Sequence, residues 1–249
     1  MTTTMTVQEG VARIKIDEPR GNSLSYETIT GIEQALEAAE KSGAQACVIE
    51  GRDRVFCSGL DLRLCSRFTR EEMTKYVDVF EGLFERIFTF PLPTVAFLAG
   101  PAIAGGAIIA LACDVRVIAP GSLIGVNEVE IGIPFPSMAF EIARFGIPAS
   151  SHVDGIMLGK KIDAVEALER GMVHEVAASV DVAVGRAREF LTRGSAAVKA
   201  TKRALRRDAL ERAQARATES RAAFVDAFYE REAQERIGAL VARLESNTK

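Results

Sequence analysis

Residues 93–118, PTVAFLAGPAIAGGAIIALACDVRVI, carry the pattern that decides the fold. Two short apolar runs, 94–98 and 115–118, are typical of buried strands, and an apolar glycine-rich turn and helix separate them. Residues 11–17 alternate apolar and polar side chains like a half-buried strand, and 46–49 is another short apolar run. Strands that alternate with helices predict an α/β fold rather than a sandwich.

Helical periodicity lies between these strands. Ile29, Ile32 and Leu36 recur at helical spacing. Thr69 and Glu72 fit a capping box, in which each residue satisfies the backbone N–H of the other, so a helix is predicted to begin there.

The character of the chain changes near residue 194. Residues 195–236 contain neither glycine nor proline, and charged residues alternate with alanine, which predicts two or three long helices. The lysines and arginines between 199 and 216 form a basic run. We interpret it as a solvated helix face paired with Asp208 and Glu211, and the alternative is a phosphate or subunit contact.

Composition limits the possible functions. The 249 residues suit one large domain or a core with an appendage, and the net charge of −3 gives no reason to expect a nucleic-acid partner. Residues 1–10 carry no recognisable secretory signal. The most apolar stretch, 95–112, is broken by three glycines and a proline, so no membrane span is expected. A cytoplasmic protein is predicted.

Cysteines and histidines give little sign of a metal site. The four cysteines contain no CxxC pair, which favours buried, unreactive thiols over disulfides or metal ligands. The only histidines are His152 and His174, and no carboxylate cluster accompanies them, so a catalytic zinc site is not expected.

Common catalytic glycine motifs are also missing. A nucleophile elbow around Ser58 would need glycine at the position of Phe56. Gly100, Gly105 and Gly106 fit neither the dinucleotide-binding pattern nor the phosphate-binding loop. These glycines therefore need another explanation.

Several blocks in the right order resemble the enoyl-CoA hydratase/isomerase (crotonase) family. Residues 55–62, VFCSGLDL, resemble its phenylalanine-x-x-glycine-x-aspartate segment, and the blocks 93–116, 127–134 and 159–173 match later family segments. The resemblance covers nearly all of residues 7–178, with weaker support in the C-terminal helices. No single motif is unique, but their order and spacing together are strongly specific.

The resemblance implies a crotonase-like α/β fold. Its spiral core of repeated ββα turns would occupy residues 1–194, and a C-terminal helical trimerisation region would occupy 195–249. A homotrimer or homohexamer is implied, with an acyl-CoA or another pantetheine thioester as the ligand. No metal or redox cofactor is implied, because CoA enters as part of the substrate.

The resemblance also implies an oxyanion hole made of the backbone N–H groups of Leu60 and Gly105. Two such donors would favour an enolate over the neutral thioester, by roughly 3 kcal/mol each. Backbone donors would explain why the side chains at both positions are apolar. The alternative interpretation of both segments is ordinary turn chemistry.

The carboxylate positions are the most informative. Hydratases of this family use two glutamates to hold water and supply a proton. Here the first position, six residues before Asp114, is Ile108, whereas the second, fourteen residues after it, is Glu128. This pattern resembles the single-glutamate isomerases of the family and implies that Glu128 is the catalytic acid/base.

The resemblance assigns the remaining site residues to substrate binding. Arg20 and Arg63 would contact the phosphate end of CoA, and Arg243 stands near the family's late lysine. Phe135 in the stretch 133–138, IPFPSM, would line an acyl pocket or pack the core. The substrate-binding set is completed by Ser23, Leu24, Ser58, Asp61 and Ile108.

The predicted function is a 3-enoyl-CoA to 2-enoyl-CoA isomerase. One alternative keeps the enolate but changes the outcome to hydration, hydrolysis or decarboxylation. Another alternative is a non-catalytic protein that binds acyl thioesters. Ile108 argues against hydration, because an isoleucine cannot orient or deprotonate water.

Overall fold

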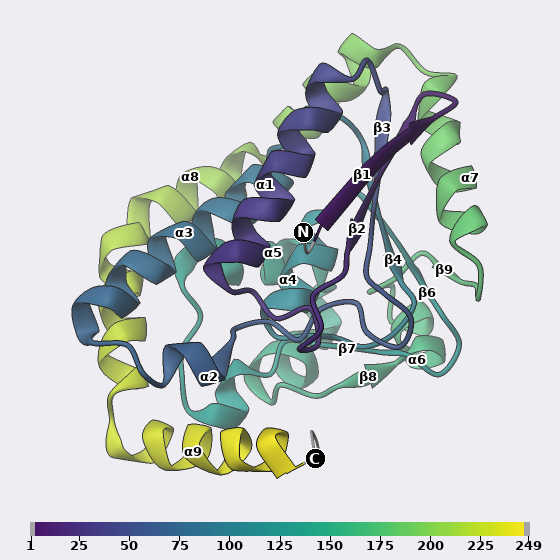
Figure 1. The fold of residues 1–249 in the computed structure, drawn as a ribbon. Coiled ribbons are helices and arrows are strands. Elements are labelled where there is room, and N and C mark those ends of the chain that lie inside the picture. Colours follow the sequence, from purple (N-terminus) through teal and green to yellow (C-terminus); the bar gives the residue numbers. More distant parts are fainter. Residues whose placement is uncertain (1–2, 247–249) are drawn as a thin grey trace.

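A computed structural model describes residues 3–246 (Figure 1). The ends of the two predicted regions, residues 1–2 and 247–249, lie outside the described part. A six-stranded sheet and a smaller three-stranded sheet form its framework. In spatial order the large sheet consists of β1 (Thr3–Gln8), β2 (Val11–Ile16), β3 (Ala46–Glu50), β4 (Thr94–Leu98), β6 (Val115–Ile118) and β9 (Glu175–Val176). The small sheet consists of β5 (Ala102–Ile103), β7 (Leu123–Gly125) and β8 (Ile162–Asp163).

The strands of the large sheet are parallel except for β1, which pairs antiparallel with β2. Helices cover both faces, with α1 and α3 on one side and α7 on the other (Figure 1). The helices of the core are α1 (Tyr26–Lys41), α2 (Leu62–Cys65), α3 (Arg70–Phe88), α4 (Gly105–Ala112), α5 (Ser137–Gly146), α6 (Ala164–Glu169) and α7 (Val180–Leu191). The predicted α/β class is confirmed.

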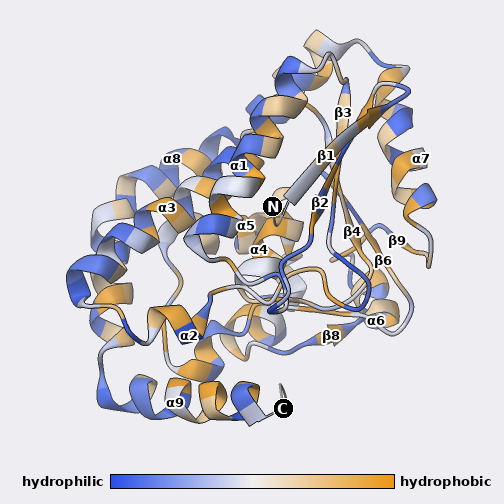
Figure 2. Cartoon of the chain, in the orientation of Figure 1, coloured by the Kyte–Doolittle hydropathy of each residue, from blue (hydrophilic) through white to orange (hydrophobic). Residues whose placement is uncertain are grey.

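Burial on both faces explains why the central strands are continuously apolar. In β4, Val95 and Phe97 pack toward α7, whereas Ala96 and Leu98 join the larger core beneath α1 and α3. In Figure 2 the inner strands are mostly orange, the colour of hydrophobic residues. The outer helix α8 (Ser195–Phe228) is mostly blue, the colour of hydrophilic residues. The predicted strands 94–98 and 115–118 coincide with β4 and β6.

The predicted capping box begins α3. The Thr69 N–H donates to Glu72 Oε2 over 2.8 Å, and the Glu72 N–H donates to Thr69 Oγ1 over 3.2 Å. An aromatic and aliphatic face of α3, including Tyr76 and Phe80, then packs into the core. This helix becomes a wall of the functional site described below.

Two long helices follow residue 194. α8 begins at Ser195 and packs along α3 and α5, and α9 (Arg231–Ser246) turns back beneath α2 (Figure 1). α9 is anchored by the buried side chains Ala233 and Ile237. Within residues 3–246, no helix combines the length and the hydropathy that a membrane span requires.

A buried ion-pair cluster joins α8 to the sheet. The Asp114 carboxylate accepts from Lys202 Nζ over 2.7 Å and from Arg206 Nη2 over 2.7 Å. Lys202 and Arg206 are 8% and 5% exposed, so the interpretation of the basic run as a solvated face is wrong for these two residues. Burial alone would raise the pKa of Asp114, but Lys202 and Arg206 hold that pKa below its ordinary value.

We predict that Asp114→Asn lowers the free energy of unfolding by about 3 kcal/mol, because it leaves two buried cations without a carboxylate. Since the pKa of Asp114 is depressed by folding, its contribution is present above the unfolded pKa and is lost as the pH falls through the folded one. Urea unfolding at pH 7 measures the loss. Asp208→Asn is the control, because Asp208 pairs with Arg207 at the surface over 3.9 Å and should change little. Equal effects of both substitutions would contradict the argument.

Candidate active site

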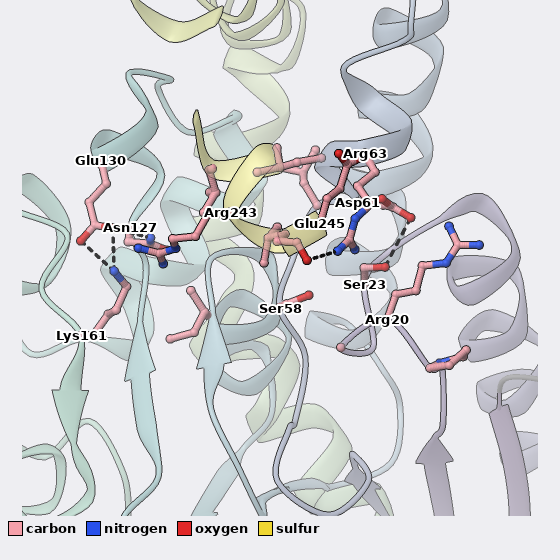
Figure 3. Close-up of a pocket in the computed structure, with 17 residues that line it drawn as sticks. Arg20, Ser23, Ser58, Asp61, Arg63, Asn127, Glu130, Lys161, Arg243 and Glu245 are labelled. Atoms are coloured by element: carbon pink, nitrogen blue, oxygen red, sulfur yellow. Dashed lines mark hydrogen bonds and ion pairs between the residues drawn. The ribbon is translucent and has the colours of Figure 1, made fainter. Parts of the chain in front are cut away.

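A cavity of about 750 Å³ lies where the loops after β2 and β3 meet α9 (Figure 3). The loop after β2 contributes Arg20 and Ser23, and the loop after β3 contributes Ser58. One end is closed by Leu60, Ile103 and Asn127. The C-terminal helix α9 contributes Leu240, Arg243, Leu244 and Glu245.

Glycine residues allow two loops at this cavity to touch backbone to backbone. Gly59 has a φ of +81°, and a Cβ built on it would lie 2.7 Å from the Gly105 nitrogen. A Cβ on Gly106 would lie only 2.0 Å from the carbonyl oxygen of Cys57. Any larger side chain at these positions would therefore push the loops apart. Of the three glycines that fitted no known motif, Gly106 is explained by this contact, whereas a Cβ on Gly100 would meet the backbone of Arg54 and one on Gly105 the ring of Phe80.

The contact brings together the two N–H groups that the resemblance assigned to an oxyanion hole. Leu60 directly follows Gly59, and Gly105 is the first residue of α4, where a helix leaves its N–H groups without intrahelical acceptors. Neither N–H donates to another group within residues 3–246. Ala104 precedes Gly105 with φ 51°, an unusual conformation that the Ala104 N–H stabilises by donating to the Gly125 carbonyl over 2.8 Å.

Glu128 is a buried carboxyl group without a partner. It begins a short 3₁₀ helix, Glu128–Ile131, and is 4% exposed. Its Oε2 has no hydrogen-bond partner within the described residues. Burial raises the pKa of Glu128 to about 8. A carboxyl group in this condition is suited to accept and return a proton near neutral pH.

Glu128 does not itself line the 750 Å³ cavity, whereas its neighbour Asn127 does. Ile108, on the first turn of α4, is also fully buried. The position where a two-glutamate hydratase would carry its first carboxylate is therefore apolar and closed to solvent.

Three hydrogen-bonded side chains, Asn127, Glu130 and Lys161, line the cavity (Figure 3). Asn127 Nδ2 donates to Glu130 Oε2 over 2.8 Å, and Lys161 Nζ pairs with the same oxygen over 2.6 Å. Burial opposes ionisation of Glu130, but these two hydrogen bonds keep its pKa below the ordinary value. Glu130 is exposed and lines the cavity. Asn127 and Lys161 were not singled out from the sequence, where only their nearness to family blocks pointed to them.

The three arginines assigned to CoA line the same cavity: Arg20, Arg63 and Arg243 (Figure 3). Arg63 Nη2 also donates to the Leu244 carbonyl over 2.9 Å, which ties α2 to α9. The cavity thus combines three arginines with apolar side chains such as Leu60, Ile103 and Leu240.

Three residues predicted to bind substrate, Ser23, Leu24 and Asp61, also make hydrogen bonds that stabilise the fold. Asp61 caps α2 by accepting from the Leu64 N–H over 3.2 Å, and it lies 3.4 Å from the Ser23 hydroxyl. Leu24 is fully buried and lines none of the described cavities, so its assignment to direct substrate contact needs correction. Its N–H donates to the Gly59 carbonyl over 2.8 Å, so Leu24 supports the oxyanion loop instead.

Of the two interpretations of Phe135, packing against the core is confirmed, and no contact with the 750 Å³ cavity is seen. It is half-buried and lines a separate hollow of about 160 Å³ together with Phe140 and residues of α8. Pro134 and Pro136 flank it, and their fixed backbone angles direct this segment toward α8 rather than toward the cavity. Met138, by contrast, is buried in the main core.

The sequence matches the family model described as enoyl-CoA hydratase/isomerase over residues 6–247. The chain belongs to this family. The resemblance and the crotonase-like fold predicted from the sequence are thereby confirmed. Enzymes of the family act on acyl-CoA thioesters, which agrees with a cavity lined by Arg20, Arg63 and Arg243 together with Leu60.

Some relatives in the enoyl-CoA hydratase/isomerase family are named hydratases and others are named isomerases. A putative enoyl-CoA hydratase of Thermus thermophilus is 36% identical over 177 residues, covering 69% of this chain and 70% of that protein. Human mitochondrial enoyl-CoA delta isomerase 1 is 34% identical over 172 residues, covering 67% of this chain and 57% of that protein.

Solved structures extend the similarity to the whole chain. The human mitochondrial delta3-delta2-enoyl-CoA isomerase superposes with a TM-score of 0.94 at 25% identity, covering all of both chains. An enoyl-CoA hydratase from Mycobacterium marinum superposes with a TM-score of 0.84 at 29% identity, covering 90% of this chain and all of that one.

We predict that Glu128→Gln stabilises the protein at alkaline pH. Because burial raises the pKa of Glu128, folding favours its protonated form, and stability falls as the pH rises toward the folded value of about 8. A glutamine cannot ionise and so avoids the cost of a buried negative charge. The free energy of unfolding of the variant should therefore exceed that of the unaltered protein by on the order of 3 kcal/mol at pH 9, and the difference should vanish near pH 4. Urea unfolding at both pH values measures it.

Glu130→Gln is the matched control two residues away. The pKa of Glu130 is lowered rather than raised, so its replacement should give no stabilisation at pH 9. A gain of equal size in both variants would show that the effect comes from surface charge and not from the burial of Glu128.

Proposed function

We propose that the protein is a 3-enoyl-CoA to 2-enoyl-CoA isomerase in which Glu128 carries the proton. The observation that supports this most directly is that Glu128 is buried and that its Oε2 has no hydrogen-bond partner within residues 3–246. A carboxyl group held by other side chains could not exchange a proton so readily.

The reaction needs one base and one anion site. Glu128 removes a proton from C2, and the electron pair of that C–H bond moves toward the thioester carbonyl to give a dienolate. The N–H groups of Leu60 and Gly105 stabilise the negative oxygen. Glu128 then returns the proton to C4, so the double bond moves from C3–C4 to C2–C3. Atoms balance without water, metal or redox cofactor.

Ile108 is the reason to prefer isomerisation over hydration. Adding water to a 2-enoyl thioester requires a second polar group that orients the water, and Ile108 is fully buried and apolar. The full-length superposition on the human isomerase supports the same choice. Hydration remains the alternative because many relatives are named hydratases, such as those of Thermus thermophilus and Mycobacterium marinum.

The 750 Å³ cavity is the proposed binding site for the CoA part of the substrate. Arg20, Arg63 and Arg243 would contact the phosphates of CoA, and the arm would run past Ser58 toward Leu60. Binding to CoA rather than to a carrier-protein thioester, assembly as a trimer or hexamer, and a cytoplasmic location stay predictions.

We predict that 3-hexenoyl-CoA gives rise to the ultraviolet absorbance of a conjugated 2-enoyl thioester. Glu128→Gln should reduce kcat by about 10²–10⁴-fold, the range for loss of a general acid/base. The matched control Glu130→Gln should retain most of the rate, because Glu130 is engaged with Lys161 and Asn127. Analysis of the products by chromatography distinguishes hydration. A dominant 3-hydroxyacyl product would favour the hydratase, and tight binding without any conversion would favour the non-catalytic protein.

We also predict a pH profile controlled by one group. The base must be ionised, so kcat/KM should rise with pH and level off above about 8, the pKa to which burial raises Glu128. Initial rates between pH 6 and pH 10 measure this rise of kcat/KM with pH. A plateau that already begins at pH 6 would mean that another group with an ordinary carboxyl pKa is the base.

A further inference from the structure

The ring of Phe80 lies directly against the proposed oxyanion hole. A Cβ built on Gly105 would lie 2.8 Å from Phe80 Cζ and 3.1 Å from Phe80 Cε2. Phe80 is 2% exposed and comes from α3. The same Cβ would lie 3.3 Å from the α-carbon of Gly59, so the Phe80 ring and the Gly59 backbone both pack against Gly105.

Other aromatic rings hold Phe80 in this position. Its ring centroid lies 5.7 Å from that of Tyr76 in a stacked geometry and 4.5 Å from that of Phe84 in an edge-on geometry. The Tyr76 hydroxyl is itself fixed, because it donates to the Leu24 carbonyl. Tyr26 packs edge-on against Tyr76 with a centroid distance of 5.3 Å. The row of rings therefore restricts the Phe80 rotamer.

The interior beyond the oxyanion hole is filled. Ile108, Glu128 and Met138 are all at most 4% exposed, and none of them lines the 750 Å³ cavity. Leu60 and Ile103 line that cavity, whereas Gly105 does not. The CoA arm has room in it, but the acyl group must continue past Gly105 into the packed interior.

We propose that Phe80 sets the acyl-chain length and restricts the enzyme to short-chain 3-enoyl thioesters of about four to six carbons. The inference rests on the proposed function, because it uses the thioester position at Leu60 and Gly105. A short acyl group needs only a small adjustment of the interior near Glu128. A longer one collides with a ring that two aromatic neighbours, Tyr76 and Phe84, hold in place.

Binding of saturated acyl-CoA tests this without requiring turnover. Isothermal titration of the full chain with hexanoyl-CoA and decanoyl-CoA should give at least tenfold tighter binding of hexanoyl-CoA. Phe80→Ala should bring the two affinities within about threefold by opening space beside Gly105. Phe80→Leu, which keeps most of the buried apolar volume, should shift the ratio in the same direction and serves if the alanine variant does not fold.

Phe88→Leu is the matched control. Phe88 is a fully buried phenylalanine of the same helix, and its ring contacts Phe145 and Arg206 instead of the site. It should leave the hexanoyl to decanoyl ratio unchanged. Equal binding of both thioesters by the unaltered protein would overturn the proposal, and so would an equal shift in the Phe88→Leu variant.

Turnover separates this proposal from the proposed function. With 3-hexenoyl-CoA and 3-decenoyl-CoA, Phe80→Leu should raise the relative kcat/KM for the longer substrate by about tenfold. If no 3-enoyl-CoA were converted while the binding preference for hexanoyl-CoA depended on Phe80, the isomerase assignment would fail and the chain-length assignment would stand.

Discussion

The site depends on one close approach between two loops. Gly59 and Gly106 face the backbone of the other loop at distances that leave no room for a Cβ, so this approach is open only to glycine. Ile103 N–H donates to the Cys57 carbonyl over 3.0 Å and fixes the two loops in register. The N–H groups of Leu60 and Gly105 converge as a result. The apolar side chains nearby are free to pack the core, because the backbone supplies the polar chemistry.

Burial of Glu128 serves chemistry at the expense of stability. The same absence of partners that leaves its carboxyl group ready for proton exchange also makes its ionised form unfavourable. The protein treats another buried carboxylate differently: Asp114 lies between Lys202 and Arg206, and these cations keep it ionised. A paired carboxylate holds α8 against the sheet, whereas Glu128 Oε2 has no partner within residues 3–246. The contrast agrees with the proton-carrying role proposed for Glu128.

Local sequence patterns and family spacing predicted the strands and the position of the proposed catalytic carboxyl group. They did not predict contacts between residues that lie far apart in the sequence. The runs at 94–98 and 115–118 are strands because they are buried on both faces, a property that hydropathy records directly. By contrast, Lys202 meets Asp114 across 88 residues, so its helix face looked solvated in the sequence. The cavity contribution of α9 and the direction of Phe135 likewise depend on how distant helices pack. Glu128 could be named in advance only because family spacing marked its position.

The two ends of the site suit two different parts of a thioester. On the side of Arg20 and Arg63 the cavity is wide and charged, as a phosphate-bearing arm requires. Beyond Gly105 the surroundings are apolar, and in such a low-dielectric region hydrogen bonds to a developing oxyanion gain strength while a carboxyl group gains basicity. Water would weaken both effects. Under the proposed function, the fully buried Ile108 occupies the position where a hydratase would hold water, which agrees with moving a proton within the substrate rather than adding a solvent molecule to it.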